Sequence, residues 1–229
     1  MEHGNVATSA VLGISSVAYA LISRKGVEAI LFWIPVFMGI FEYDVPLKIA
    51  IRNTGDLAMI AFIVAFAAAS MLFLPYLIIP YALFFAVYAT RLPMARNKLN
   101  HYGNAIGLLA YSLLFSFTIQ GVNFLSFVIG GTLFLYLVGA EFSVRSKLKR
   151  NGKLLLYNVF PAFLGLLEPG FFIYSLSLIR IPAATVTREV RKIGMIETSL
   201  MIIVVAFLLL SLHSGAIFTP NIHSTFLKY

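Results

Sequence analysis

Cysteine is absent from this chain of 229 residues, and charged residues are scarce. The lack of cysteine excludes disulfide bonds, thiolate catalysis and metal sites with cysteine ligands. Charged residues make up 11% of the sequence, whereas soluble domains contain about 25%. Hydrophobic residues make up 60%. This composition excludes an ordinary soluble domain and indicates a protein of the lipid bilayer.

Metal-binding and nucleophile patterns are also missing. The chain has four histidines, and none lies three or four positions from another histidine or a carboxylate. A Gly-x-Ser-x-Gly nucleophile motif and a Walker phosphate loop are absent as well. The sequence therefore predicts no metal and no cofactor, and it identifies no catalytic residue.

Long apolar runs dominate what is present, and they are typical of transmembrane helices. Residues 57–89 contain no charge, and a single helix of that length would measure about 50 Å, which exceeds the ~30 Å hydrocarbon core. We therefore predict two spans with a turn near Pro75. The whole chain is predicted to be one all-α domain, a membrane bundle of eight to nine short helices arranged as hairpins. The predicted membrane helices are 26–41, 57–72, 74–89, 103–120, 122–141, 153–167, 170–186 and 194–212, with 5–22 as a further span or an interfacial helix.

The triplet Glu168-Pro169-Gly170 is a strong turn signal between the helices predicted at 153–167 and 170–186. Both of these helices are short for a membrane span, so a partly re-entrant path is an alternative. Arg180 lies near the end of the second helix, and we expect its side chain to extend outward to the membrane surface.

Basic residues alternate with the apolar runs in a way that predicts orientation. The loops at 42–56, 91–101, 142–153 and 180–192 lie on one face of the predicted bundle and hold 14 of the 17 basic residues. The positive-inside rule makes this face cytoplasmic, places the protein in the cell membrane and leaves the C-terminus outside. We expect contact with anionic lipid headgroups rather than with nucleic acid. The densest basic patch consists of Arg145, Lys147, Lys149, Arg150 and Lys153.

Carboxylates at membrane depth are candidates for function because their burial is costly. Four acidic residues meet this description: Glu28, Glu141, Glu168 and Glu197. Each also has a structural alternative. Glu141 precedes Arg145 by four residues, which suits a helix ion pair, and Glu197 lies close to Arg191 and Lys192. We favour structural pairing for these two and a hydrated turn for Glu168. For Glu28 the functional and the structural interpretations have equal weight.

One polar cluster lies beside a basic loop, where His101 is flanked by several asparagines. This cluster could contact a phosphate or a lipid headgroup, and a solvated loop is the alternative. The candidate ligand-binding residues are Arg91, Arg96, His101, Arg145 and Lys147.

Three segments carry a resemblance to a known family. They are Gly-Val-Glu-Ala-Ile-Leu-Phe-Trp-Ile-Pro at 26–35, the stretch 134–152 with Val-Arg-Ser-Lys at 144–147, and Arg-Lys-Ile-Gly-Met-Ile-Glu at 191–197. In this order they resemble the YwiC-like family of integral membrane proteins, whose function is not established. Two positions depart from the family. Lys25-Gly26-Val27-Glu28 stands where a His-Gly-Ala-Trp-like start is usual, and Asn100-His101 replaces an Asn-Asp pair.

The hairpin layout also resembles, more distantly, the UbiA prenyltransferase superfamily. That resemblance places two cytoplasmic loops at 88–107 and 139–153. In the superfamily these loops carry Asp-rich motifs that bind prenyl diphosphate through Mg²⁺, which prefers carboxylate and phosphate oxygens. Here the first loop contains no acidic residue and the second offers only Glu141. The resemblance thus implies a shared layout without visible diphosphate chemistry, and it favours a protein that is not an enzyme.

These observations favour a multi-pass membrane protein that binds or processes a lipid-like, isoprenoid or phosphorylated amphiphile at a basic cytoplasmic mouth. A small transporter is an alternative, motivated by Glu28, Glu141 and the proline-broken helices. A non-catalytic accessory subunit of a membrane complex is a second alternative. The sequence predicts no particular protein partner.

Overall fold

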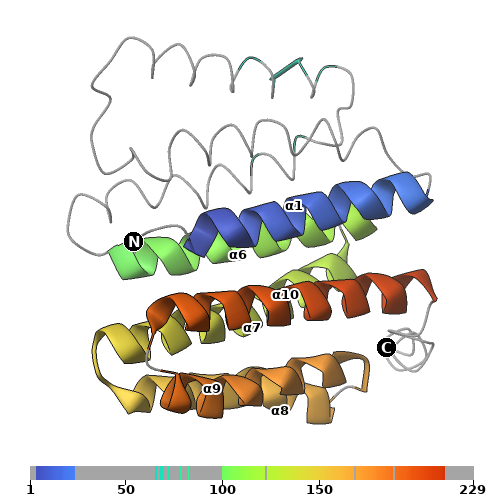
Figure 1. The fold of residues 1–229 in the computed structure, drawn as a ribbon. Coiled ribbons are helices and arrows are strands. Elements are labelled where there is room, and N and C mark those ends of the chain that lie inside the picture. The colour runs from blue at the N-terminus through green and yellow to red at the C-terminus, as the bar shows by residue number, and fades with distance from the viewer. Residues whose placement is uncertain are drawn as a thin grey trace, which may run out of the picture. The chain divides into compact units, whose positions relative to one another are not determined.

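The computed structural model describes residues 4–23, 100–121, 123–167, 169–187 and 189–214, together with six isolated positions between 65 and 82. Every regular element in these ranges is a helix, and no strand occurs among them (Figure 1). The all-α prediction is therefore confirmed for this part of the chain. Contacts divide the chain into two compact units, Met1–Phe134 and Leu135–Tyr229. The spans predicted between 26 and 89 fall outside the described helices.

The first unit contains α1 (Gly4–Ser23), α6 (Asn100–Gln120) and the beginning of α7 (Phe124–Leu148). α1 packs against α6. Leu12 of α1 and the aromatic residues Tyr111 and Phe115 of α6 are fully buried. Their apolar side chains form the core of this unit because they leave no surface exposed to solvent or lipid.

A tight turn joins α6 to α7, between the helices predicted at 103–120 and 122–141. Gly121 has a φ of 73°, a left-handed conformation that glycine adopts without a steric penalty. The side chain of Asn123 then caps α7, because its Oδ1 accepts a hydrogen bond of 2.9 Å from the Ser126 backbone N–H. Its Nδ2 donates to the Gln120 carbonyl oxygen at 2.8 Å. These bonds fix the reversal of the chain.

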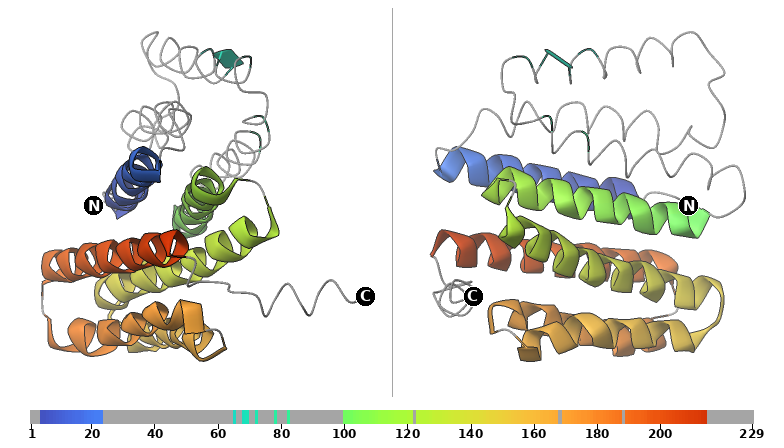
Figure 2. Two further views of the ribbon diagram at one scale, coloured as in Figure 1. Left: turned by 90° about the vertical axis from the view of Figure 1, so that its right-hand side faces the viewer. Right: turned by 180° about the vertical axis from the view of Figure 1, so that it is seen from behind.

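The second unit contains the end of α7 and two composite rods. In the first rod, the 3₁₀ helix η3 (Gly152–Asn158) continues into α8 (Val159–Leu167). In the second rod, η4 (Pro169–Ile179) continues into α9 (Arg180–Val186). The final helix is α10 (Val190–His213), which contacts η4 and α9 and runs alongside the second half of α7 (Figure 2).

The 3₁₀ segments lengthen both rods. A 3₁₀ helix rises about 2.0 Å per residue and an α-helix about 1.5 Å, so the first rod is about 28 Å long and the second about 32 Å long. Both lengths match a hydrocarbon core of about 30 Å. Two segments that would be too short to cross a bilayer as α-helices are therefore long enough in this conformation.

α7 and α10 are each long and apolar enough to cross a membrane, with 25 and 24 residues. This finding favours a membrane location for the protein. Several large apolar side chains of these helices are exposed, among them Leu135, Ile202 and Leu210. Exposed apolar side chains of this size suit contact with lipid chains.

The two rods approach each other closely at Gly165 of α8. A Cβ atom at this position would lie 2.9 Å from the Cα of Phe172 and 3.1 Å from the carbonyl oxygen of Phe171. Both of these atoms belong to the backbone of η4, which cannot move aside as a side chain can. The hairpin of α8 and η4 therefore requires glycine at this crossing.

Candidate functional site

A buried ion pair lies at the centre of the second unit. Arg180, the first residue of α9, is 1% exposed, and its Nε donates to Oε2 of Glu197 at 2.6 Å. Glu197 is buried about two turns into α10. An arginine stays charged inside a protein, and an unpaired charge there is strongly unfavourable. The burial of each residue is therefore explained by the presence of the other.

Further polar groups complete the surroundings of the Arg180 guanidinium group. Its Nη1 donates to the carbonyl oxygen of Tyr136 at 2.8 Å and to Oδ1 of Asn158 at 3.3 Å. The Nδ2 of Asn158 in turn donates to Oγ of Ser143 at 3.0 Å. The guanidinium carbon lies 3.9 Å from the centroid of the Tyr136 ring, which is a cation–π contact. We call this group of residues (Tyr136, Ser143, Asn158, Arg180 and Glu197) the polar centre.

The polar centre forms where each rod changes from 3₁₀ to α geometry. Asn158 is the last residue of η3, and Arg180 is the first residue of α9. The carbonyl group of Asn158 accepts a hydrogen bond of 2.6 Å from Oγ of Ser177, so the change of helical register leaves this oxygen satisfied. Gly139 lets α7 come close, because a Cβ there would lie 2.7 Å from Oδ1 of Asn158 and 3.2 Å from Nη1 of Arg180.

Two buried atoms of the polar centre make no hydrogen bond within the part of the chain that the structure describes. They are Nη2 of Arg180 and the hydroxyl oxygen of Tyr136. Tyr136 is fully buried. Buried polar groups in proteins are nearly always hydrogen-bonded, so these two atoms are unusual.

The prediction for Arg180 is wrong, whereas the structural pairing predicted for Glu197 is confirmed with a different partner. Arg180 does not extend outward but is enclosed, and Glu197 pairs with Arg180 rather than with Arg191 or Lys192. The reason is that Glu197 of α10 supplies a counter-charge for Arg180 inside the protein, a tertiary contact that the sequence spacing does not show. The sequence did contain a signal for the burial of Glu197, since it lies four residues after Ile193, on the buried face of α10.

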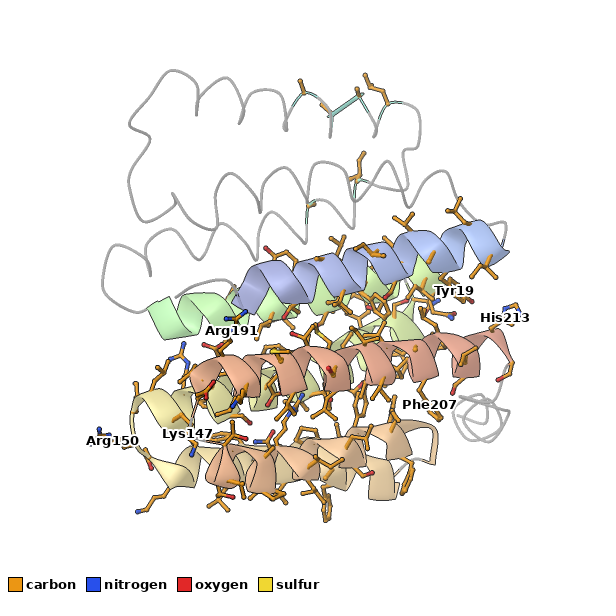
Figure 3. The ribbon with its side chains drawn as sticks, viewed as in Figure 1. Tyr19, Lys147, Arg150, Arg191, Phe207 and His213 are labelled. Carbon is orange, nitrogen blue, oxygen red and sulfur yellow. The ribbon has the colours of Figure 1, made fainter. Side chains whose placement is uncertain are left out.

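A basic surface lies at one end of the second unit. Lys147 and Arg150 from the end of α7 and Arg191 from the start of α10 lie together at this end, whereas His213 lies at the other (Figure 3). A small apolar cluster holds the converging chain segments together, and Nζ of Lys147 donates to the Thr185 carbonyl oxygen at 3.3 Å. The buried members of that cluster are Leu155, Ala184 and Ile193, and Val144 and Ile181 pack against them.

Two other basic side chains near this end of the second unit, Arg145 and Lys192, have acidic partners. Arg145 pairs with Glu141 at 2.6 Å, which confirms the helix ion pair predicted from their spacing. Lys192 pairs with Glu189 at 3.0 Å on the surface. Four exposed cations have no ion-pair partner among the described residues, and we call them the basic end. They are Lys149, Arg150, Lys153 and Arg191.

The backbone at the basic end is strained at one residue. Arg150 has a φ of 50°, in the left-handed region that glycine usually occupies. It closes α7 in a Schellman motif, because the Asn151 N–H donates to the Ser146 carbonyl oxygen at 2.9 Å and the Arg150 N–H donates to that of Lys147 at 3.2 Å. The sequence thus places a cation where glycine would be less strained.

The structure describes only some of the other predicted site residues. Glu28, Glu168, Arg91 and Arg96 lie outside the described residues, and His101 belongs to α6 in the first unit, with an undescribed side chain. Arg145 and Lys147 are at the same end of the second unit, but their head groups already contact Glu141 and Thr185. Sequence reasoning did not select Lys149, Arg150, Lys153 or Arg191 as candidate ligand-binding residues. No group of three or more His, Cys, Asp or Glu residues suited to a metal occurs within the described ranges.

Comparison with known proteins gives no relative for this chain. No family model matches it, and neither a curated protein nor a solved structure does. The resemblances to the YwiC-like family and to the UbiA superfamily therefore stay predictions.

Proposed function

We propose that this protein is a multi-pass membrane protein that binds a phosphate-bearing, anionic amphiphile at its basic end. The observation that carries the proposal is the gathering of four exposed cations, without an ion-pair partner among the described residues, from two segments that are about 40 residues apart in sequence. A phosphate group suits this site because arginine and lysine are the usual donors to phosphate oxygens.

The positions of α7 and α10 support this function. Both helices are long enough to cross the bilayer, and the basic end lies where α7 ends and α10 begins. Cations at the end of a membrane-spanning helix lie at the level of the lipid headgroups. The amphiphile's apolar part would then remain in the bilayer while its phosphate contacts the protein. The positive-inside rule makes this the cytoplasmic surface.

The strained Arg150 also supports binding at this end. Glycine at this position would relieve the left-handed backbone, and the chain has a glycine only two residues later. Strained residues cluster at ligand-binding sites, because there the side chain contributes something that offsets the strain. A cation at the end of α7 is such a contribution.

The test is lipid binding in nanodiscs followed by native mass spectrometry. We expect phosphatidic acid and phosphatidylglycerol to be retained in preference to phosphatidylcholine. Replacing Arg150 or Lys153 by Gln should weaken retention about fivefold each, since one cation near an anionic surface contributes about 1 kcal/mol. Lys192→Gln is the matched control, because the amine of Lys192 already pairs with Glu189. Equal retention of all three lipids, or equal effects of all three substitutions, would contradict the proposal.

A further inference from the structure

The first rod, formed by η3 and α8, has a buried face and an exposed face. Leu155 and Asn158 of η3 and Ala162 of α8 are buried. They are three and four residues apart, and these spacings keep side chains on one side of a 3₁₀ helix and of an α-helix. The buried face packs inside the second unit, and the opposite side of the rod is exposed.

The exposed face begins with a cation and continues with apolar side chains. Lys153 belongs to the basic end, and Leu156 and Val159 follow it at intervals of three residues. Phe163 lies four residues after Val159 and continues the same face in α8. Leu156, Val159 and Phe163 are 63%, 44% and 58% exposed. We call these four residues and two flanking aromatic residues the rod face, which consists of Lys153, Leu156, Tyr157, Val159, Phe160 and Phe163.

The rod face has about the length of one leaflet of a bilayer. About 18 Å along the rod separates Lys153 from Phe163, since the chain rises about 2.0 Å per residue to the end of η3 and about 1.5 Å per residue in α8. Half of the hydrocarbon core measures about 15 Å. With Lys153 at the level of the headgroups, the apolar side chains of the rod face lie at the depth of the lipid chains in the same leaflet.

Aromatic contacts order the rod face close to the basic end. Tyr157 stacks on Phe142 of α7, with 4.2 Å between the ring centroids and 15° between the planes. The ring of Phe160 lies 6.1 Å from that of Tyr157. Both side chains are nevertheless exposed. Rings that already pack on one another lose little freedom when a ligand binds, so this part of the surface is pre-organised.

We infer that the rod face binds an acyl chain of a phospholipid whose phosphate contacts the basic end. This inference rests on the function proposed above, and it identifies the ligand as a lipid rather than a water-soluble phosphate compound. The rod face presents its cation and its apolar side chains in the order in which a phospholipid carries its phosphate and its chains. A single lipid molecule therefore supplies both a charge for Lys153 and an apolar chain for the side chains below it.

The experiment uses phosphatidic acid with a diazirine group in its acyl chain. The full-length protein is placed in nanodiscs with this lipid or with phosphatidylcholine that carries the same chain. Native mass spectrometry measures lipid retention, and peptide mapping locates the cross-links. We expect phosphatidic acid to label residues 156–163 about fivefold more than phosphatidylcholine does, because only the first lipid is held by the cations.

Two results would separate this inference from the proposed function. If phosphatidic acid is retained in preference but labels the exposed side chains of α8 and α10 evenly, the inference is overturned and the proposed function stands. If neither lipid is preferred in retention, both are overturned. Preferred retention together with labelling concentrated on residues 156–163 supports both.

Two substitutions test the two ends of the rod face. Lys153→Gln should lower the labelling of residues 156–163 by phosphatidic acid about fivefold, because the phosphate loses one cation. Phe160→Ala should lower it about threefold, because the chain loses the dispersion contacts of a ring. Unchanged labelling in both variants would contradict the inference.

Phe172→Ala is the matched control for Phe160→Ala. Phe172 belongs to η4 of the second rod and is 63% exposed, almost the same as Phe160 at 64%. Both substitutions therefore remove an exposed ring of the same size. Phe172→Ala should leave the labelling of residues 156–163 unchanged. An equal loss in the two variants would mean that the chain is not held by the rod face, and the inference would fail.

Discussion

At the scale of single residues, the Arg180–Glu197 pair has the largest predicted effect on stability. Glu197→Gln leaves a buried guanidinium group without its counter-charge, so we expect the free energy of unfolding to fall by about 3 kcal/mol or more. Arg180→Met should have an effect of similar size. Equilibrium unfolding of the detergent-solubilised protein measures both.

The double variant Arg180→Met with Glu197→Leu supplies the control for this pair. It removes both charges, so its loss should be smaller than the sum of the single losses by about 2 kcal/mol. Additive losses would mean that the two residues do not stabilise each other. Lys192→Gln, at an exposed pair, should change stability by less than about 1 kcal/mol.

A second prediction at the residue scale concerns Arg150. Because its φ of 50° suits glycine, Arg150→Gly should raise the free energy of unfolding by about 1 kcal/mol. Arg150→Ala removes the same charge but keeps the strained conformation, so it should not stabilise the protein. Both variants should bind phosphatidic acid equally weakly. If alanine stabilises as much as glycine, the gain comes from charge removal and not from the backbone.

At the scale of helices, the crossing of α8 and η4 predicts a sharp difference between two glycines. Gly165→Ala would bring a methyl group within 2.9 Å of the η4 backbone, so the hairpin must open and the protein should lose about 2 kcal/mol of stability or more. Gly194→Ala, on α10, meets no atom within 4 Å and should be neutral or stabilise by up to about 1 kcal/mol. Thermal unfolding of the two variants decides the point, and similar melting temperatures would refute this account of the crossing.

At the scale of the whole molecule, the absence of cysteine makes topology directly measurable. Lys149→Cys and Ser214→Cys introduce single thiols at exposed positions near the end of α7 and the end of α10. If α10 crosses the membrane, a thiol reagent that does not permeate the bilayer should label Ser214→Cys in intact cells and Lys149→Cys only after the membrane is opened. Labelling of both from the same side would show that α10 does not cross.

The sequence predicted the helical nature of the described chain because the apolar runs and turn signals are strong and local. It also predicted the Glu141–Arg145 pair, since a spacing of four residues brings side chains together on any α-helix. It did not predict the polar centre. Arg180 meets Tyr136, Asn158 and Glu197 only through tertiary packing, and the 3₁₀ conformation of η4 has no distinctive residue pattern.

The 3₁₀ conformation of η4 links the ion pair to the thickness of the bilayer. Changing the 11 residues of η4 to α-helix would shorten the rod by about 5 Å, because the rise per residue is smaller in an α-helix. It would also rotate α9 by roughly 220°, because the turn per residue falls from about 120° to about 100°. That rotation would carry Arg180 away from Glu197. The pair therefore fixes the length of the rod, and a variant without it, such as Arg180→Met with Glu197→Leu, should be free to shorten in thin bilayers. Hydrogen exchange of residues 169–179, measured in short-chain and in long-chain lipids, would detect this adaptation. Identical exchange in the parent protein and in the double variant would exclude it.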